Sequence, residues 1–519
     1  MSQPLRCVSP HAIIVGYDFS TGGVKALAFD LSGNTVAQVR LPTDLWTEGG
    51  VSELNLMQLE GQARAATRAL TKKLDGSGDL AYIAACGISA THHTAGRIEW
   101  TGNQVRRAIC WNDQTLAEYH AEGLRRLGGQ ERAKELTGGP WAVRYSLSHL
   151  VKDEHTLGEA DWERTELILP HGPLAAGYLT GRFDCTSVSS AASTGIMDLR
   201  TNQWRKEMLD ALANPHYREL AADCLPTIID MNEPVGALSE SVALDAQWPG
   251  GSRPLVFPTV DAQAAGLIGG GAVDAGQVAI ILGNSAVVNS SSDRLPQSGT
   301  LDAMKLNWGP YLWMRCYSNG ALFVDTVAGK DWYKLESDAA KVPPLCNGVS
   351  VLPFLLSEPS VGVEKPQVKW SQAKSGDTAG VEPSERPVKV RACLEALAFL
   401  LARAVKEHEA AGQTVSRITV SGGMARSNLM CQILASAVNK PLERLVSDEG
   451  PALGAAVVAL AGLESHLRKQ QGIAEPYSAA DAVAAMVKFR DRVEPVAAWV
   501  GEYAKGLEEF ERRLSKAGE

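Results

Sequence analysis

The chain has 519 residues, about three times a common domain length, so more than one hydrophobic core is expected. It carries 50 Lys and Arg against 59 Asp and Glu, a formal net charge of −9, without long runs of like charge. This balance argues against a nucleic-acid or anionic-membrane partner held by a basic surface. It does not exclude a small anionic ligand, because glycine turns and helix ends bind such groups locally.

The composition, 45% hydrophobic and 21% charged, is that of an ordinary globular protein. The longest apolar run, around residues 453–463, is far shorter than the roughly 20 residues of a membrane span. The first residues hold no apolar signal core, and the nine cysteines form no C-x-x-C pair. We therefore expect a cytoplasmic protein with reduced, buried thiols and no membrane partner.

The first half alternates short apolar runs with helical patterns. Strands are predicted at residues 12–18, 24–30, 35–41, 83–88 and 107–111, and helices at 58–74 and 115–127. The first three strands follow one another across short turns, which indicates an antiparallel meander. The fourth strand runs into the segment SATHH, residues 89–93, so it delivers two histidines into a loop. The alternation of strands and helices favours α/β layers.

A cluster of Pro and Gly at residues 248–254 marks the predicted domain division, with one domain over 1–253 and a second over 254–519. The second half restarts with a strand at 255–260, which ends at Asp261, and a strand at 278–282, which ends in a polar turn. A strand, a turn and a strand would then open both halves. A polar surface excursion is expected over 366–387, followed by helices with apolar stripes over 390–405 and 499–514.

Neither G-x-x-x-x-G-K-[ST] nor a G-x-G-x-x-G after a strand occurs, so a nucleotide must be held by other turns. The candidates are the turns at residues 18–23 and 283–285, and the step Gly422-Gly423 between a strand and a helix. Glycines let the backbone approach a ligand, and a helix N-terminus favours anionic groups. Taken alone, a Gly-Gly step of this kind is more often an ordinary tight connection than a ligand contact.

A series of motifs in a fixed order resembles the FGGY family of carbohydrate kinases over roughly residues 12–463. The motifs are VGYDFSTGGVKA (15–26), CGIS (86–89), WNDQ (111–114), LTGRFD (179–184), ASTG (192–195) with Asp198, DA (261–262), LGNS (282–285), LPFL (352–355), RACLEALAF (391–399), SGGM (421–424) and PALGAA (451–456). Each piece is modest, and their common order and spacing carry the resemblance.

The resemblance implies an α/β, actin-like ATPase fold in which two ribonuclease-H-like domains surround a central cleft for ATP, Mg²⁺ and a sugar or polyol. It also implies transfer of the γ-phosphoryl group to a substrate hydroxyl. Such transfer needs positioned groups, neutralised phosphate charge and a carboxylate that accepts the hydroxyl proton. Asp261 matches the family's general base and would also contact the substrate. Asp18 matches the acid placed near Mg²⁺.

Further positions follow from the same resemblance. Those implied for the nucleotide are Ser20, Thr21 and Lys25 in the first turn, Gly283, Asn284 and Ser285 in the second, and Gly422, Gly423 and Asn428 on the adenine side. Those implied for the substrate are His92, His93 and Asp113, with Trp111 and Trp141 beside them. Lys25 fits a surface charge equally well, the histidines fit ordinary loop residues, and Trp141 fits a core residue.

The chain departs from the family pattern at several places. Ser20 stands for the usual Gly and Asn284 for the usual Thr, changes that conserve size and polarity. The pattern Gln-(Met/Gln)-His-Gly is replaced by THHT at residues 91–94. Thr115 stands where an Arg is frequent, and SEP at 357–359 replaces Gly-Glu-Arg. The substrate-side changes remove the residues that would name the sugar.

The leading hypothesis is an ATP-dependent kinase of a ketopentose such as xylulose or ribulose. A polyol such as glycerol or erythritol, or a heptulose, is the alternative acceptor. A sugar-binding pseudokinase is disfavoured because Asp18 and Asp261 are both retained, and an actin-like assembly or chaperone ATPase would leave the histidine loop without a role. We expect domain closure near residue 253 to exclude water. Whether the chain forms a homodimer is left open.

Overall fold

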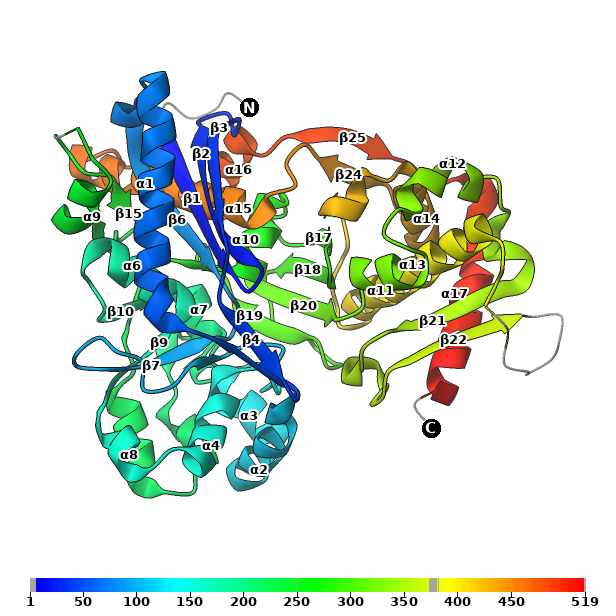
Figure 1. Cartoon of the computed structure of the whole chain (residues 1–519), viewed down its shortest axis with the longest axis horizontal. Coiled ribbons are helices and arrows are strands. Elements are labelled where there is room, and N and C mark those ends of the chain that lie inside the picture. The colour runs from blue at the N-terminus through cyan, green and yellow to red at the C-terminus, as the bar shows by residue number, and fades with distance from the viewer. Residues whose placement is uncertain (1–5, 250, 373–379, 381, 518–519) are drawn as a thin grey trace.

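The computed structural model describes residues 6–249, 251–372, 380 and 382–517. Two α/β units lie side by side in Figure 1, each built on a seven-stranded sheet. The N-terminal strands form the sheet on the left, and strands from the later part of the chain form the sheet that runs to the right. The α/β fold class is therefore confirmed.

The first sheet has the order β14-β15-β6-β1-β2-β3, with β16 also paired to β6. Its strands are β1 (Ile13–Ser20), β2 (Gly23–Asp30), β3 (Thr35–Leu41), β6 (Ile83–Ala90), β14 (Gly236–Ala237), β15 (Leu255–Val256) and β16 (Val260–Asp261). The predicted meander is confirmed, because β1 pairs antiparallel with β2 and β2 with β3. Strand β6 is parallel to β1, and β15 and β16 are both parallel to β6.

Strands β15 and β16 follow the predicted division between residues 253 and 254, yet both pair with β6. The first sheet thus takes in residues as far as Asp261. The domain division itself stays a prediction. The pairing of β15 and β16 with β6 places these two strands, which follow the division, in the sheet of the first unit.

The second sheet has the order β19-β20-β18-β17-β23-β24-β25. Its strands are β17 (Gln277–Leu282), β18 (Ala286–Ser292), β19 (Asp302–Lys305), β20 (Tyr311–Tyr317), β23 (Arg417–Ser421), β24 (Leu442–Leu445) and β25 (Phe489–Val493). Strand β17 is antiparallel to β18 and parallel to β23. This repeats the arrangement of β1 with β2 and β6, so both sheets contain the strand-turn-strand opening that the sequence predicts.

Helices cover both sheets, and a smaller helical region extends from the first unit. The α-helices are α1 (Leu59–Ser77), α2 (Ala117–Leu127), α3 (Gln130–Thr137), α4 (Ser146–Thr156), α5 (Glu159–Glu163), α6 (His171–Thr180), α7 (Val188–Ala192), α8 (Pro215–Asp223), α9 (Glu240–Asp245), α10 (Ala262–Gly269), α11 (Ala321–Val327), α12 (Glu336–Ala339), α13 (Arg386–Ala410), α14 (Asn428–Val438), α15 (Gly450–Gln471), α16 (Ala479–Met486) and α17 (Ala497–Ala517).

Short strands complete the fold. They are β4 (Leu45–Glu48), β5 (Val51–Leu54), β7 (Ala95–Glu99), β8 (Ala108–Ile109), β9 (Thr165–Pro170), β10 (Cys185–Ser187), β11 (Met197–Asp198), β12 (Gln203–Trp204), β13 (Thr227–Ile229), β21 (Val349–Phe354) and β22 (Gln367–Gln372). Strand β22 pairs with β21 and is mostly part-buried or exposed, and α13 begins at Arg386, so the polar segment predicted over 366–387 contains a hairpin strand and the first turn of a helix. Residues 373–379 and 381 lie outside the described part of the chain.

Small residues bring α10, α15 and the first sheet into backbone contact. A Cβ added at Gly454 would lie 1.9 Å from the Ala265 carbonyl oxygen, and one added at Gly16 would lie 1.9 Å from the Ala452 carbonyl oxygen. The small residues of PALGAA therefore let α15, from the late part of the chain, pack on β1 and α10. This packing fixes the sheet edge at which Asp18 and Asp261 lie.

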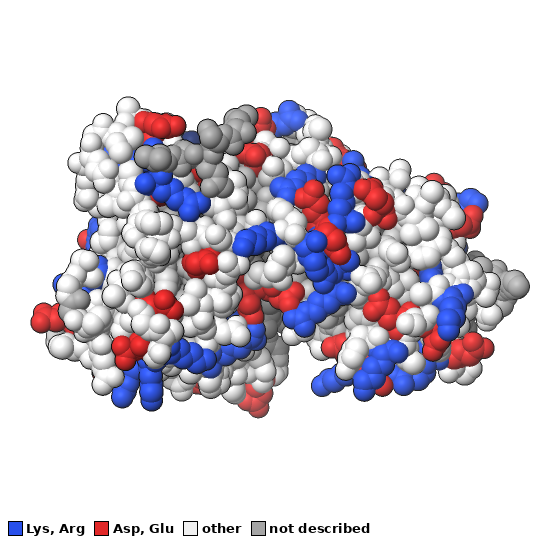
Figure 2. All heavy atoms as spheres, turned by 90° about the horizontal axis from the view of Figure 1, so that it is seen from above, with Lys and Arg blue, Asp and Glu red and all other residues white. Residues whose placement is uncertain are grey.

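Helix α15 is also the one described helix long and apolar enough to cross a membrane by length and composition, and 78% of its apolar window is buried inside the protein. The C-terminal helix α17 docks through Tyr503, Leu507, Phe510 and Leu514, as predicted from its apolar stripe. All nine cysteines are free, and most are buried, as expected. On the face seen in Figure 2, acidic and basic side chains are intermixed.

Candidate active site

Two buried carboxylates end strands at the same edge of the first sheet. Asp18 on β1 pairs in register with Ser89 on β6, and Asp261 on β16 pairs with Ala90 on β6. Because adjacent strands lie about 4.8 Å apart, the two carboxylate-bearing residues are roughly 10 Å apart, with β6 between them. Each is only 5% exposed. The carboxyl ends of parallel strands are the usual place for a ligand in α/β folds.

Asp18 is a buried acid with few partners. The Ser89 hydroxyl donates a hydrogen bond to its Oδ1 over 3.1 Å. Burial raises the pKa of Asp18 to about 6, and the nearby Lys25 ammonium opposes part of that shift. A carboxylate held away from water in this way gains from a cation, and oxygen donors of this type are those that Mg²⁺ prefers. The residue present therefore fits the metal that the sequence implies.

Lys25 lies directly opposite Asp18 in the antiparallel ladder of β1 and β2. Its Nζ lies 2.7 Å from Glu449 Oε2, and Arg40 also pairs with Glu449, the residue that precedes α15. The side chain is thus part of the Asp18 environment and is held by an ion pair to α15. Ser20 donates to the Gly23 carbonyl over 2.9 Å. Thr21 is half-buried at the tip of the same turn.

Asp261 is held from several directions. It is the N-cap of α10, where its Oδ1 accepts from the Gln263 backbone N–H over 3.3 Å, and its own N–H donates to Ser189 Oγ over 3.1 Å. The His92 ring contacts the same carboxylate, with Nδ1 against Oδ1. A helix N-terminus and an N–H donor both favour the ionised form of a carboxyl.

The loop after β6 carries the two histidines into the interior. His93 has a positive φ of 62°, and its Nδ1 donates to the Ser193 carbonyl over 2.8 Å. Its ring stacks on Tyr145 at 4.5 Å between centroids. The ring is only 2% exposed, and burial, with the His92 ring second in effect, holds its pKa well below the ordinary value. Neutral His93 therefore presents a buried Nε2 without a hydrogen-bond partner among the described residues.

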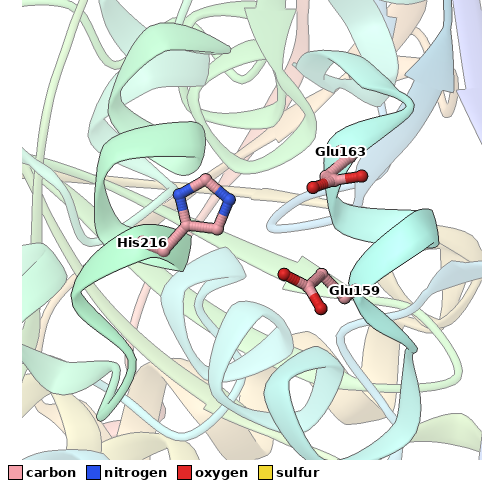
Figure 3. A group of neighbouring side chains, drawn as sticks. All are labelled: Glu159, Glu163 and His216. Carbon is pink, nitrogen blue, oxygen red and sulfur yellow. The ribbon is translucent and has the colours of Figure 1, made fainter.

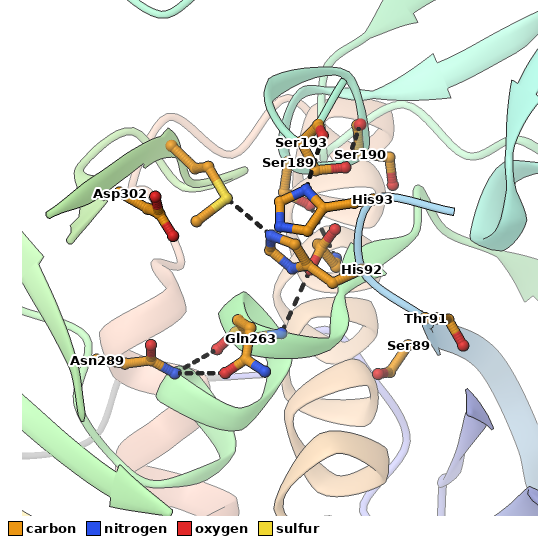
Figure 4. A network of polar contacts seen from close by, with 12 residues as sticks. Ser89, Thr91, His92, His93, Ser189, Ser190, Ser193, Gln263, Asn289 and Asp302 are labelled. Carbon is orange, nitrogen blue, oxygen red and sulfur yellow. Dashed lines mark hydrogen bonds and ion pairs between the residues drawn. The ribbon is translucent and has the colours of Figure 1, made fainter. Parts of the chain in front are cut away.

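Residues of the second unit reach this loop (Figure 4). Met304 Sδ on β19 lies 2.8 Å from His92 Nε2. Asn307, just after β19, accepts from the Ser189 N–H over 2.8 Å and donates to the Thr259 carbonyl over 3.0 Å. The Asp302 carboxylate pairs with the Arg144 guanidinium. The surroundings of Asp261 are thus assembled from both units.

Two of the turns predicted for the nucleotide, at residues 283–285 and 422–423, meet at one edge of the second sheet. Ile281 on β17 pairs with Ser421 on β23, so the turn after each strand lies beside the other. Gly422 has a φ of 90°, and a Cβ there would lie 2.5 Å from the Leu282 carbonyl oxygen. In the first of these turns Asn284 is exposed, with Gly283 and Ser285 half-buried. Gly423 is exposed in the second turn.

Three other predicted positions have internal partners. Asp113 accepts from the N–H groups of Ser52 and Thr115, the latter over 2.9 Å, and lies 3.6 Å from Lys152 Nζ. Asn428 Oδ1 accepts from Arg444 over 2.7 Å. Trp141 is 1% exposed in the hydrophobic core, as its core alternative predicts. Asp113 and Asn428 stay predictions as ligand contacts.

Two further features lie outside the two predicted turns and the histidine loop. Glu159, Glu163 and His216 are exposed and bring ligand-type atoms within 4.8 Å of one another (Figure 3). Such exposed groups are common without an ion, so they carry no assignment. An apolar cavity of about 270 Å³ lies between α13 and α17, lined in part by Phe399 and Phe510.

Several residues of the site have no local sequence signal. They come from two segments, Arg144-Tyr145 before α4 and Asp302, Met304 and Asn307 on or just after β19, which both pack around the histidine loop. The one local feature among them is that Asn307 lies just after a strand, β19. Their contribution depends on packing between distant elements.

The structure defines a class of two-unit α/β folds with two buried carboxylates at one sheet edge. The solved structure of a xylulose kinase from Rhodospirillum rubrum superposes with a TM-score of 0.81 at 19% identity, covering 97% of this chain and 98% of that chain. The fold is thus the actin-like ATPase fold of the sugar kinases, as the resemblance implies.

Family models sharpen the class. The N-terminal domain model of the FGGY family of carbohydrate kinases matches residues 13–266, and the C-terminal domain model matches residues 307–463. The chain belongs to this family and is a phosphotransferase with an alcohol group as acceptor. The xylulose kinase of Escherichia coli (strain K12) is 28% identical over 469 residues, covering 86% of this chain and 89% of the relative. The glycerol kinase of Geobacter sp. (strain M21) is 27% identical over 471 residues, with the same coverage of 86% and 89%.

Proposed function

We propose that this sugar or polyol kinase phosphorylates a hydroxyl of a ketopentose such as xylulose or ribulose, with ATP as donor. The observation that carries the mechanism is the pair of buried carboxylates at one sheet edge, Asp18 and Asp261. The xylulose kinases among the relatives support the ketopentose. The replaced loop at residues 91–94 leaves room for another acceptor.

In this mechanism Asp261 is the general base. The acceptor hydroxyl oxygen attacks the γ-phosphorus, the bond to the bridging oxygen breaks to release ADP, and the hydroxyl proton passes to the Asp261 carboxylate. His93 Nε2 and the Tyr145 hydroxyl, both buried and without a partner among the described residues, supply polar atoms for the other hydroxyls of the acceptor. A buried polar atom of this kind gains from a ligand that completes its hydrogen bond.

Kinases of this family use ATP, typically with Mg²⁺. On this chain we place the phosphates between the turn of Ser20, Thr21 and Lys25 and the turn of Gly283, Asn284 and Ser285. The adenine side would be formed by Gly422, Gly423 and Asn428. Asp18 would hold Mg²⁺, which supplies positive charge to the phosphate oxygens when bound.

A polyol acceptor is the second candidate, because glycerol kinases stand among the relatives at 26–28% identity. The histidine loop is compatible with either acceptor, since the proposal requires only a hydroxyl that reaches Asp261. The two candidate acceptors differ in chain length and in the presence of a carbonyl group. Comparing the activity with each acceptor is therefore the way to distinguish them.

ADP release measured with xylulose, ribulose, glycerol, erythritol and sedoheptulose tests the proposal. We expect stimulation by a ketopentose well above that by glycerol. Stimulation by glycerol alone would replace the ketopentose with a polyol. Acceptor-independent hydrolysis, or acceptor binding without ADP release, would contradict kinase activity and support an assembly ATPase or a pseudokinase, respectively.

A further inference from the structure

His92 uses both ring nitrogens inside the protein. Nδ1 contacts Asp261 Oδ1, and Nε2 lies 2.8 Å from Met304 Sδ. Its side chain is 6% exposed, so the ring is almost entirely removed from water. Atoms of this chain therefore lie against both ring nitrogens and occupy the space in which a sugar hydroxyl would have to approach. The role of His92 in the site is therefore different from that of a residue that contacts the substrate directly.

The proton on this ring is fixed by its partners. Burial holds the pKa of His92 well below its ordinary value, and the positive charge of Arg144 acts in the same direction. A neutral imidazole has one N–H donor and one bare nitrogen, and a carboxylate oxygen only accepts. A carboxylate oxygen is a stronger acceptor than a thioether sulfur, so the proton of a neutral ring is best placed on Nδ1, against Asp261 Oδ1, with Nε2 bare against the sulfur of Met304.

The contacts to Asp261 are concentrated on one oxygen. Oδ1 faces the His92 N–H and also accepts from the Gln263 backbone N–H over 3.3 Å. Within the described part of the chain, no hydrogen bond or ion pair reaches Oδ2. Two anchors on Oδ1 fix the plane of the carboxylate and leave Oδ2 for a ligand.

We propose that His92 is a positioning residue that holds the Asp261 carboxylate through Oδ1, so that Oδ2 faces the acceptor hydroxyl. The inference rests on the proposed role of Asp261 as general base. It also distinguishes the two histidines, since His93 Nε2 has no partner among the described residues, whereas His92 Nδ1 lies against Asp261 Oδ1 and His92 Nε2 lies against Met304 Sδ. The resemblance implies Met or Gln at this place, so the imidazole at this position is a feature of this chain.

Other charged and titratable groups surround the pair. The His93 ring lies 3.7 Å from the His92 ring between centroids, Arg144 pairs with Asp302 on β19, and buried His149 lies beyond His93. Arg144 is the cation among them, and its charge is shared with Asp302. Through Met304 and Asp302, both on β19, the second unit contacts the His92 ring and the nearby cation Arg144.

Three substitutions test which of the two ring nitrogens of His92 is needed. His92→Asn keeps an N–H donor near the place of Nδ1, His92→Gln places its amide near Nε2 instead, and His92→Met removes both polar atoms. A carboxylate that loses its anchor rotates out of line, and misplacement of about 1 Å costs about 100-fold in rate. We expect kcat to fall about 10- to 100-fold in the Gln and Met variants, with KM for ATP within about twofold.

The Asn variant should stay within about threefold of the wild-type kcat, because it keeps the donor. The acid limb of the kcat/KM profile should move to higher pH in the Gln and Met variants and stay in place in the Asn variant, since loss of a donor raises the pKa of a carboxyl. The assay is ADP release with whichever acceptor, xylulose, ribulose or glycerol, the wild type uses best. The exposed His155 provides the matched control, His155→Gln, which should leave kcat unchanged.

Equal losses in the Asn, Gln and Met variants, or no loss in any, would overturn the inference. Thermal unfolding gives a result that does not depend on turnover. His92→Met should lower the melting temperature in the wild-type background and have little further effect once Asp261→Ala is present, because coupled residues are non-additive. Additive shifts would overturn the contact. If the wild type transfers phosphate to none of the acceptors, the proposed function fails and this cycle still decides the His92 pairing.

Discussion

The two sheets share a local plan and differ in their chemistry. In each, a first strand is antiparallel to the second and parallel to a later one, and a turn follows the first strand. The first sheet places charged groups at its edge: Asp18, Lys25 and Asp261. The second sheet has only Gly, Asn and Ser in the corresponding turn. Under the proposed function, the first unit would handle charge and proton transfer, and the second would hold the nucleotide through backbone and neutral groups.

The strongest way to break this comparison is Asp261→Asn, which removes the base and keeps the cap on Gln263. We expect kcat to fall about 100- to 10,000-fold, the usual contribution of a general base. ADP release with the best acceptor measures it, and an unchanged melting temperature is the control for folding. A kcat within about tenfold of the wild type would remove Asp261 from the mechanism.

Asp18→Asn tests the second carboxylate. Its buried charge is expected to hold Mg²⁺, so we predict a fall in kcat of about 100-fold and a higher Mg²⁺ concentration at half-maximal rate. Asn keeps an oxygen for the Ser89 hydroxyl, so the local fold is retained. An unchanged Mg²⁺ dependence would argue that the first sheet does not carry the metal.

Asn284→Asp places a carboxylate in the uncharged turn of the second sheet. If this turn faces phosphate, like charges should raise KM for ATP about tenfold, while KM for the acceptor changes little. Asn284→Thr, which restores the residue usual in the family, is the matched control and should resemble the wild type. Equal changes in both KM values would place the turn elsewhere.

The smallest effect is on stability, in the core of the second unit. Burial lowers the pKa of His408 to about 3, and its Nδ1 is hydrogen-bonded to Ser290 over 2.8 Å. The folded form therefore favours the neutral ring, and stability is lost as pH falls below about 6.5. Between pH 7 and pH 5 this amounts to about 2 kcal/mol. His408→Gln should flatten the fall of melting temperature over this range, and an unchanged slope would show that another group controls it.

Strand ends and the order of motifs were predictable, because apolar runs and the polar turns after them are local features. Asp18 and Asp261 follow such runs, and the structure places them at one sheet edge. The pairing of β15 and β16 with β6 was not predictable, because register between distant segments has no local pattern. The ion pair of Lys25 with Glu449 has the same origin, since Glu449 arrives with α15.

The histidine loop shows the same limit at the level of one residue. Sequence predicts two histidines at a strand end, and both are in the site. It does not separate the ring that contacts Asp261 from the ring with a free nitrogen, because that depends on Met304, Ser193 and Asp261 in space.

The most direct test of the account is a ³¹P NMR time course with wild-type protein, ATP, Mg²⁺ and the best acceptor. Transfer to a hydroxyl predicts a phosphate monoester signal that grows in equal amount with ADP and is absent without acceptor. Appearance of inorganic phosphate with ADP, and no monoester, would contradict phosphoryl transfer to a sugar or polyol.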